Sequence, residues 1–196
     1  NIMDHHLGAG ASGTIDGFTD KYYKGRRPNG IYVPRFRNLD SRKPEKNFLR
    51  GYGYQGGAGR WGISEHVAEL GYGAEYKEKM LEPGKWRMSL GGFGECLPNH
   101  DNKMTLDYNK LDEWVLPTVT FDAEWKENEL AMRKDMVQQA VNMLEKGGFK
   151  DIRTFDRPDA PGIGIHEMGT ARMGRDPKTS VLNEHNQIHA VPNVYV

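Results

Sequence analysis

The residues with the clearest chemical potential lie near the C-terminal end of the chain, in Gly162–His166. Glycine and isoleucine alternate there, so an extended strand would place Gly162, Gly164 and His166 on one face and the isoleucines on the other. Glycine inside a strand commonly marks close approach by a ligand or a backbone, which would leave open space before the imidazole. A neutral imidazole can accept a proton during catalysis. A core histidine bonded to a carbonyl before a turn explains the spacing equally well, so the residues alone leave both interpretations open.

Other reactive side chains give weaker signals. Glu95 follows the bend at Gly91–Gly94 and could reach a pocket, although pairing with an arginine explains it at least as well. Cys96 has no positive neighbour in the sequence that would lower its pKa, so we expect a buried small residue. The remaining histidines show neither metal-ligand spacing on a predicted helix nor a cysteine pair beside them, so no metal site is predicted. Four tyrosines could stack on a sugar ring or simply form strand faces: Tyr22, Tyr23, Tyr52 and Tyr54.

A glycine-rich sequence near the start, Gly8–Gly13, fits the GxGxxG pattern of dinucleotide-binding proteins. That pattern binds a pyrophosphate only between a buried strand and a helix N-terminus. The preceding residues are too polar for a central parallel strand, and Thr14–Phe18 shows no helical periodicity. The sequence therefore predicts a flexible loop here and not a nucleotide site.

Short alternating segments predict the elements that must position these residues. We expect strands at 31–36, 48–54, 86–90, 103–107 and 118–121 and near Ile152, with a polar turn at Asn99–Asn102. Pro34 should make the first an edge strand or its end. Residues 64–80 read as two short helical turns broken by glycines. A long helix is predicted over about 124–146, with Leu130, Val137, Ala140, Val141 and Leu144 on its buried face and Gly147–Gly148 as its stop. Strands without βαβ alternation favour an antiparallel sheet and an α+β fold.

Composition narrows the class of protein. The 196 residues carry 27 Lys+Arg and 27 Asp+Glu, so no basic surplus exists to bind a phosphate backbone, and nucleic acid is excluded as the expected partner. No apolar segment is long enough to span a bilayer. The sequence opens on Asn1 without an initiator methionine, which suggests a chain cut from something longer.

Several motifs together resemble one enzyme family. The sequence His-Glu-Met-Gly-Thr-Ala-Arg-Met-Gly at 166–174, followed by Asp176-Pro177, Ser180–Asn183 and Pro192–Val196, resembles the C-terminal block of glucose–methanol–choline (GMC) flavin oxidoreductases. Three stretches agree in order: Asn1–His5, Gly94–Pro98 with Asn102, and Asn128-Glu129. Val115, after Trp114, departs from the pattern at a turn where relatives often have glycine.

The resemblance implies a role for His166. Family members oxidise an alcohol by passing hydride to N5 of FAD while a histidine accepts the hydroxyl proton, and His166 matches that histidine. Met168, Gly169 and Thr170 would line the flavin side of the pocket, and Glu95 is a candidate for substrate contact. The resemblance implies an antiparallel sheet of about six strands backed by helices, with residues 1–157 as the substrate-binding domain and 158–196 as the histidine-containing segment returning toward the flavin domain.

The resemblance also implies parts outside this chain. The FAD-binding Rossmann domain would lie mainly upstream, and the second active-site histidine or asparagine downstream of Val196. The expected partners are a small alcohol or sugar, the missing FAD domain and an electron-acceptor subunit. The sequence thus predicts a fragment of an FAD-dependent alcohol or sugar dehydrogenase or oxidase, inactive alone. The alternative is a non-catalytic module of the same fold that binds carbohydrate or a partner through its aromatic surface.

Overall fold

A computed structural model describes residues 2–18, 30–40, 42–43, 47–60, 72–81 and 84–196. The chain forms two compact units, one from Leu7–Gly94 and Leu130–Pro158, the other from Asn1–His6, Glu95–Glu129 and Asp159–Val196. The elements, in chain order, are β1 (His6–Ile15), β2 (Gly30–Val33), β3 (Tyr52–Arg60), α1 (Ala74–Leu81), β4 (Trp86–Gly94), β5 (Lys103–Leu111), β6 (Pro117–Asp122), α2 (Glu127–Lys146), β7 (Lys150–Asp156), β8 (Gln187–Ile188) and β9 (Val191–Tyr195).

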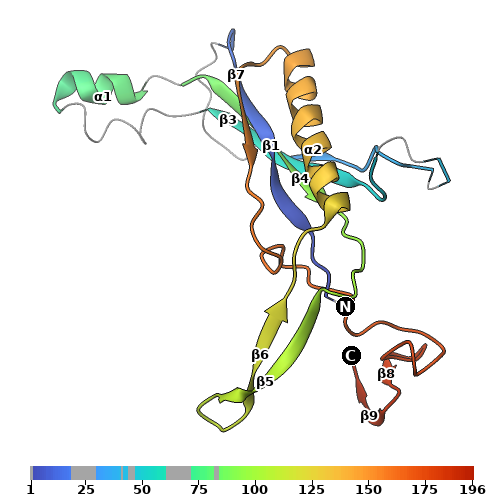
Figure 1. Ribbon diagram of the computed structural model, residues 1–196. Helices are drawn as coiled ribbons and strands as arrows, with labels where there is room; N and C mark the ends of the chain where they lie inside the picture. The colour runs from blue at the N-terminus through green and yellow to red at the C-terminus, as the bar shows by residue number, and fades with distance from the viewer. Residues whose placement is uncertain (1, 19–29, 41, 44–46, 61–71, 82–83) are drawn as a thin grey trace. The chain divides into compact units, whose positions relative to one another are not determined.

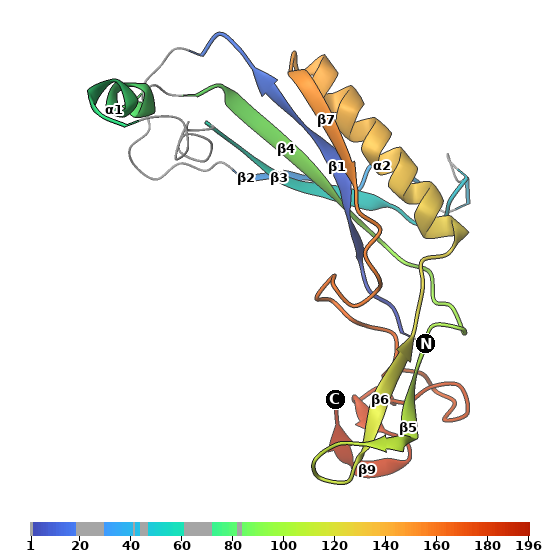
Figure 2. The same cartoon turned by 60° about the vertical axis from the view of Figure 1, so that its left-hand side comes forward.

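A five-stranded sheet in the order β2-β3-β4-β1-β7 forms the centre of the first unit. The pairs β2–β3, β3–β4 and β1–β7 are antiparallel. Figures 1 and 2 show α2 lying along one face of this sheet. The predicted α+β class with an antiparallel sheet backed by a helix is confirmed. The sheet has five strands in the described part of the chain, against the expected six or so.

The predicted flexible loop at Gly8–Gly13 is wrong, because these residues form the middle of β1, between β4 and β7 in the sheet. Ala9 and Ala11 are fully buried. A Cβ on Gly10 would lie 2.0 Å from the carbonyl oxygen of Leu90, so glycine is required for β4 to approach this closely. Because β1 consists mainly of small residues, its sequence shows no hydrophobic alternation, and it is buried because β4 and β7 lie on either side of it.

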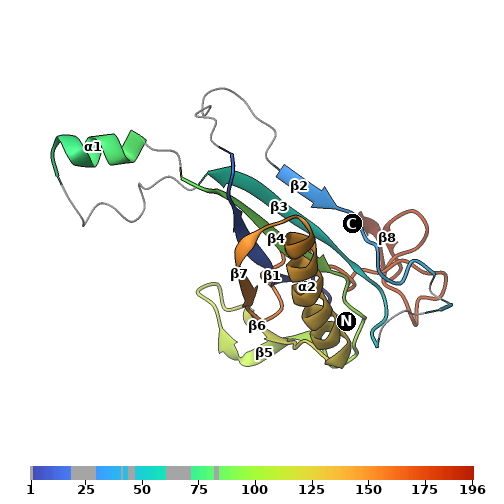
Figure 3. The ribbon, with the colours of Figure 1, turned by 90° about the horizontal axis from the view of Figure 1, so that it is seen from above.

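The core lies between the sheet and α2. Met132, Met136, Ala140 and Leu144 recur every fourth residue and are at most 1 % exposed, while Val137 and Val141 pack beside them. The predicted face is therefore right from Val137 onward, but Leu130, which the prediction included, is 42 % exposed. Seen from above in Figure 3, α2 lies on one side of the sheet.

Both ends of α2 have specific caps. Glu129 accepts a hydrogen bond from the Lys126 amide at 3.2 Å, the return bond of a capping box. At the other end Gly148 adopts a φ of 79°, and the bonds Phe149 N to Leu144 O and Gly148 N to Glu145 O, both 3.0 Å, form a Schellman motif. The predicted stop at Gly147–Gly148 is confirmed.

The tyrosines of β3 belong to the core. Tyr52 and Tyr54 are 2 % and 0 % exposed, and the Tyr54 hydroxyl donates to the Met136 carbonyl at 2.5 Å. Burial raises the pKa of both phenols well above the ordinary value. They are strand faces and cannot present an aromatic surface to a sugar, whereas Tyr22 and Tyr23 lie outside the described residues.

The remaining strand predictions differ mainly at their ends. Strand β2 stops at Val33, directly before Pro34, and lies at the sheet edge as predicted. Strand β3 begins at Tyr52, later than predicted, and Phe48 is buried ahead of it. Strands β4, β5, β6 and β7 confirm the predicted positions. Helix α1 begins after Gly73, and most of the predicted turns before it lie outside the described residues.

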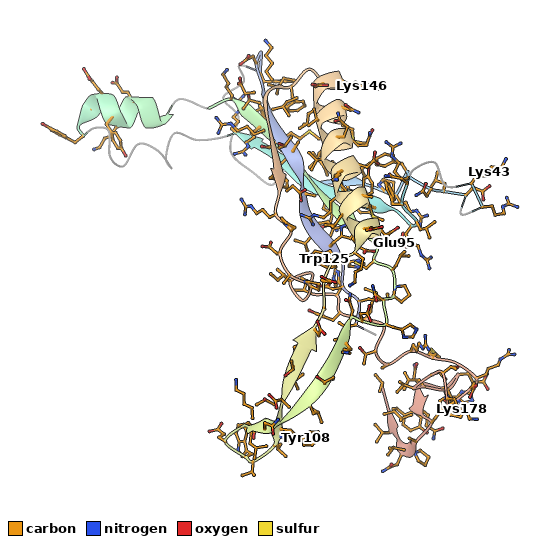
Figure 4. All side chains as sticks on the ribbon, viewed as in Figure 1. Lys43, Glu95, Tyr108, Trp125, Lys146 and Lys178 are labelled. Atoms are coloured by element: carbon orange, nitrogen blue, oxygen red, sulfur yellow. The ribbon has the colours of Figure 1, made fainter. Side chains whose placement is uncertain are left out.

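The second unit contains two hairpins, β5–β6 and β8–β9. The polar turn before β5 is confirmed, since Asn102 N donates to Asn99 O at 3.2 Å. The buried Asn102 side chain then ties the base of the hairpin: it accepts from Glu124 N at 3.1 Å and donates to Glu124 O at 3.2 Å. The outer part of the hairpin carries exposed apolar side chains, among them Tyr108, labelled in Figure 4.

Candidate active site around His166

The loop that carries His166 is not a strand. Gly162 and Ile165 have φ angles of 109° and 55°, which interrupt the extended backbone that the alternating sequence predicted. Ile163 and Ile165 are 56 % and 79 % exposed, so they do not form a buried face. A β-branched residue in the left-handed region is rare and costs free energy, so contacts from elsewhere must hold this conformation.

The carboxylate of Asp4 supplies those contacts. Its Oδ2 accepts hydrogen bonds from Gly162 N at 2.9 Å and Gly164 N at 2.7 Å, and its Oδ1 accepts from His5 N at 2.7 Å. Asp4 is 2 % exposed. Burial alone would raise the pKa of this carboxyl, but the backbone N–H groups outweigh it and lower the pKa below the ordinary value. Asp4 is therefore an anionic anchor for the loop.

The residues on either side of Asp4 contact the same loop. Met3 and Met168 exchange two backbone hydrogen bonds, each 2.8 Å, as an antiparallel bridge. The His5 ring packs edge-on against the His166 ring, with centroids 5.1 Å apart and an interplanar angle of 85°. Three consecutive residues thus hold the loop before, beside and after His166.

The two glycines of the loop, Gly162 and Gly164, have different surroundings. A Cβ on Gly164 would lie 2.2 Å from Asp4 Oδ1 and 2.5 Å from the His5 carbonyl oxygen, so this position must be glycine for the carboxylate to reach the loop. A Cβ on Gly162 would meet nothing within 4 Å. The prediction that both glycines clear space before the imidazole is therefore wrong for Gly164.

The remaining predicted site residues fall into two places. His166, Met168 and Thr170 are exposed, and Gly169, with a φ of 90°, turns the chain between the last two. Glu95 follows directly after β4 and is half-buried; Figure 4 labels it.

A cavity of about 170 Å³ has Asp4 among its lining residues. Its lining includes Asp4, Cys96, Asn102, Trp125 and Glu129 but neither Glu95 nor His166. The Cys96 thiol donates to the Asp4 carbonyl oxygen, and burial together with the Glu129 carboxylate raises its pKa to about 12. Cys96 is thus a neutral thiol, and it is half-buried where the sequence predicted a buried small residue.

Sequence reasoning identified His166 but missed Asp4 and His5 as its neighbours. Both belong to Asn1–His5, which the resemblance marked only as a connecting segment. The available signal was an acidic residue and two histidines directly before a buried strand of small residues. That pattern does not show which distant loop the carboxylate would bind.

Comparison with known proteins identifies the family to which the sequence belongs. Residues 98–196, just over half of the chain, match the family described as GMC oxidoreductase. The chain belongs to the GMC oxidoreductase family. This family consists of FAD flavoproteins that act on alcohols and sugars, and the match covers its C-terminal domain, which contains His166.

Three similar proteins match between 69 % and 89 % of this chain. The sequence is 29 % identical to 2-methyl-1,2-propanediol dehydrogenase of Mycolicibacterium austroafricanum over 89 % of this chain and 32 % of that protein. It is 28 % identical to the gluconate 2-dehydrogenase flavoprotein of Pantoea cypripedii over 76 % of this chain and 27 % of that protein. It is 25 % identical to pyranose 2-oxidase of Lyophyllum shimeji over 69 % of this chain and 22 % of that protein. This GMC chain therefore spans about a third or less of the length of these relatives.

The exposed groups of the His166 loop have the chemistry to contact a planar ring such as the flavin of FAD. They are the imidazole and the apolar side chains of Ile163, Ile165 and Met168, and a Cβ on Gly162 would meet nothing within 4 Å. The glycine-rich β1 is a strand between β4 and β7, and the described residues directly after it, 16–18, are not helical. The strand–turn–helix arrangement that binds a pyrophosphate is therefore not seen in the described residues here. Within the described ranges of this GMC chain, no helix has the length and apolar character needed to cross a bilayer.

Proposed function

We propose that this chain is the substrate-domain portion of an FAD-dependent oxidoreductase that oxidises a CH–OH group of an alcohol or sugar, with His166 as the proton acceptor. The observation that carries the proposal is an exposed imidazole on a loop whose backbone is fixed by a buried carboxylate. Family membership supports the reaction class. The geometry supports the choice of residue.

The oxidation removes a hydride from the carbon and a proton from the hydroxyl oxygen, so that a C=O bond forms and two electrons leave the substrate. FAD, when bound, supplies the acceptor for the hydride. The role of this chain is to place a neutral imidazole nitrogen of His166 within hydrogen-bond reach of the hydroxyl and to take its proton. A fixed loop matters because a misplaced base loses much of its effect.

The neighbouring residues have supporting roles in this proposal. Met168, Gly169 and Thr170 would lie against the flavin side of the site, and Glu95 stays a weaker candidate for substrate contact. From the family resemblance we expect the FAD domain and the second active-site histidine or asparagine outside residues 1–196, and an electron-acceptor subunit as a further partner. The division into residues 1–157 and 158–196 likewise stays a prediction.

The test is anaerobic stopped-flow reduction of the flavin in the FAD-loaded, full-length protein. His166→Ala should keep its FAD and slow reduction by an alcohol or sugar substrate roughly 10²–10⁴-fold, the usual contribution of a positioned base. His185→Ala is the matched control, because the His185 side chain is 76 % exposed and its described ion-pair partner is the neighbouring Glu184. If the flavin of the His166→Ala protein is reduced at the wild-type rate, His166 is not the proton acceptor.

A further inference from the structure

We propose that Asp4 is a positioning residue for the reaction: its carboxylate holds the backbone of Gly162–His166 in the conformation that presents the His166 imidazole. The catalytic part of this inference rests on the proposed function. The structural part, that Asp4 locks the loop, stands on the hydrogen bonds alone and can be tested separately.

The first step of the argument is the convergence of donors on one side chain. Three backbone N–H groups, from His5, Gly162 and Gly164, point at the two oxygens of Asp4 within 2.9 Å. The carboxylate is buried, so water does not compete effectively for these bonds. A residue from the start of the chain thereby fixes two alternate amides of a loop about 160 positions away.

The second step is that the arrangement needs a carboxylate and not merely a polar side chain. One oxygen accepts the two loop amides and the other accepts His5 N. An asparagine has one oxygen and one NH₂ group, so it would turn a donor toward at least one N–H group. Asp4→Asn therefore changes little in volume but removes part of the lock.

The third step is that the loop requires an external lock. Ile165 holds a φ of 55°, which an isoleucine seldom adopts. It lies between Gly164, bonded to Asp4, and His166, packed against the His5 ring. Without the carboxylate the backbone of Ile165 can relax to a more common conformation, and that relaxation rotates the adjoining His166. The imidazole direction thus depends on a residue that does not touch the substrate.

The experiment uses the FAD-loaded, full-length protein and two independent measurements. The first is hydrogen-exchange mass spectrometry of the peptide containing residues 162–166, which reports on the loop without any reference to activity. The second is stopped-flow flavin reduction, which separates the limiting reduction rate from substrate affinity. Asp112→Asn is the matched control, because one Asp112 oxygen also accepts two backbone amides, Trp114 N and Leu116 N, both at 2.9 Å.

For Asp4→Asn we expect faster exchange in residues 162–166 and a limiting reduction rate lowered roughly 10- to 100-fold, with substrate affinity changed much less. Asp112→Asn should change neither quantity. In a His166→Ala background the Asp4→Asn substitution should slow reduction no further, because its effect acts through His166.

Three results would overturn the inference. One is unchanged exchange in Asp4→Asn; another is faster exchange with an unchanged reduction rate. The third is an equal loss of rate in the presence and absence of His166. If His166→Ala itself reduces at the wild-type rate, the proposed function fails, while the exchange measurement still decides whether Asp4 locks the loop.

A second variant keeps the test decisive if Asp4→Asn does not fold. Gly164→Ala introduces a methyl group 2.2 Å from Asp4 Oδ1 and must push the carboxylate away from the loop. It should reproduce the faster exchange and the slower reduction. Wild-type behaviour of a folded, FAD-loaded Gly164→Ala protein would contradict the proposed lock.

Discussion

Different interactions stabilise two regions of the chain: the five-stranded sheet with α2, and the segment Asp159–Val196. The sheet and helix bury their apolar side chains in one core, including Tyr54, Leu90 and Met136. In the C-terminal segment Leu182 is buried, but most large apolar side chains are exposed. Backbone N–H groups of this segment donate to side-chain oxygens of Asp4, Asp176 and Asn183. The difference separates a scaffold that is stabilised by packing from a hydrogen-bonded segment that exposes the His166 imidazole.

The largest expected effect tests the packing half of this comparison. A Cβ on Gly56 of β3 would lie 1.9 Å from the Ser89 carbonyl oxygen, which cannot move without breaking the β3–β4 ladder. Gly56→Ala should therefore destabilise the sheet by about 3 kcal/mol. Hydrogen exchange in β3 and β4 peptides gives the local free energy of opening.

Gly59→Ala in the same strand is the control, because a Cβ there meets nothing within 4 Å. It should change the opening free energy by at most about 0.5 kcal/mol. Equal effects of the two substitutions would show that close packing does not govern this sheet.

The next effect concerns the buried arginine of the scaffold. Arg133 is 1 % exposed; it donates to Asp156 Oδ1 from Nε at 2.8 Å and to the Leu7 carbonyl at 2.7 Å. Arg133→Met keeps the apolar volume but leaves both acceptors without this donor, so we expect a loss of about 2 kcal/mol. The melting temperature reports this loss.

Arg42→Met is the comparison variant, since the Arg42 side chain is 87 % exposed and its pair with Asp40 should contribute less than about 1 kcal/mol. A drop in melting temperature for Arg42→Met as large as that for Arg133→Met would contradict the assignment of Arg133 to the scaffold.

The smallest effect tests the hydrogen-bonded half of the comparison. Ser180 Oγ donates to the Asp176 carbonyl at 2.7 Å and lies 3.1 Å from His189 Nε2, which is 3.0 Å from the Gly174 carbonyl oxygen. Ser180→Ala should cost about 1 kcal/mol and act locally. Exchange should rise in peptides covering residues 174–189 and stay unchanged in β3 and β4. A rise in both regions would contradict a local role for Ser180.

The scaffold was largely predictable because its signals are local. The 3.6-residue spacing and the two glycines of α2 predicted the helix and its end, and alternation predicted four strands of the chain at the right places. Strand β1 was missed because alanine, glycine and serine carry no hydrophobic pattern, and its burial depends on close approach by β4. Leu130 was misplaced because it lies at the edge of the apolar stripe, whose buried centre is formed by Met132, Met136, Ala140 and Leu144.

The candidate site was predictable only in part. His166 stays a prediction that rests on the specific motif its neighbours form, and the conformation of its loop was predicted wrongly. The alternating sequence favours a strand, but Gly162 N and Gly164 N donate to Asp4, and Ile165 adopts a left-handed backbone conformation. Contacts between residues about 160 positions apart leave no periodic trace in a single sequence.

Chemical rescue tests the central claim, that His166 accepts the substrate proton, most directly. In the FAD-loaded, full-length protein, His166→Gly should reduce its flavin slowly, and added imidazole should raise the rate because it can occupy the vacated space and take the proton. Imidazole should not accelerate the wild-type protein or His185→Gly. Wild-type reduction by His166→Gly without imidazole, or a slow rate that imidazole leaves unchanged, would contradict the claim.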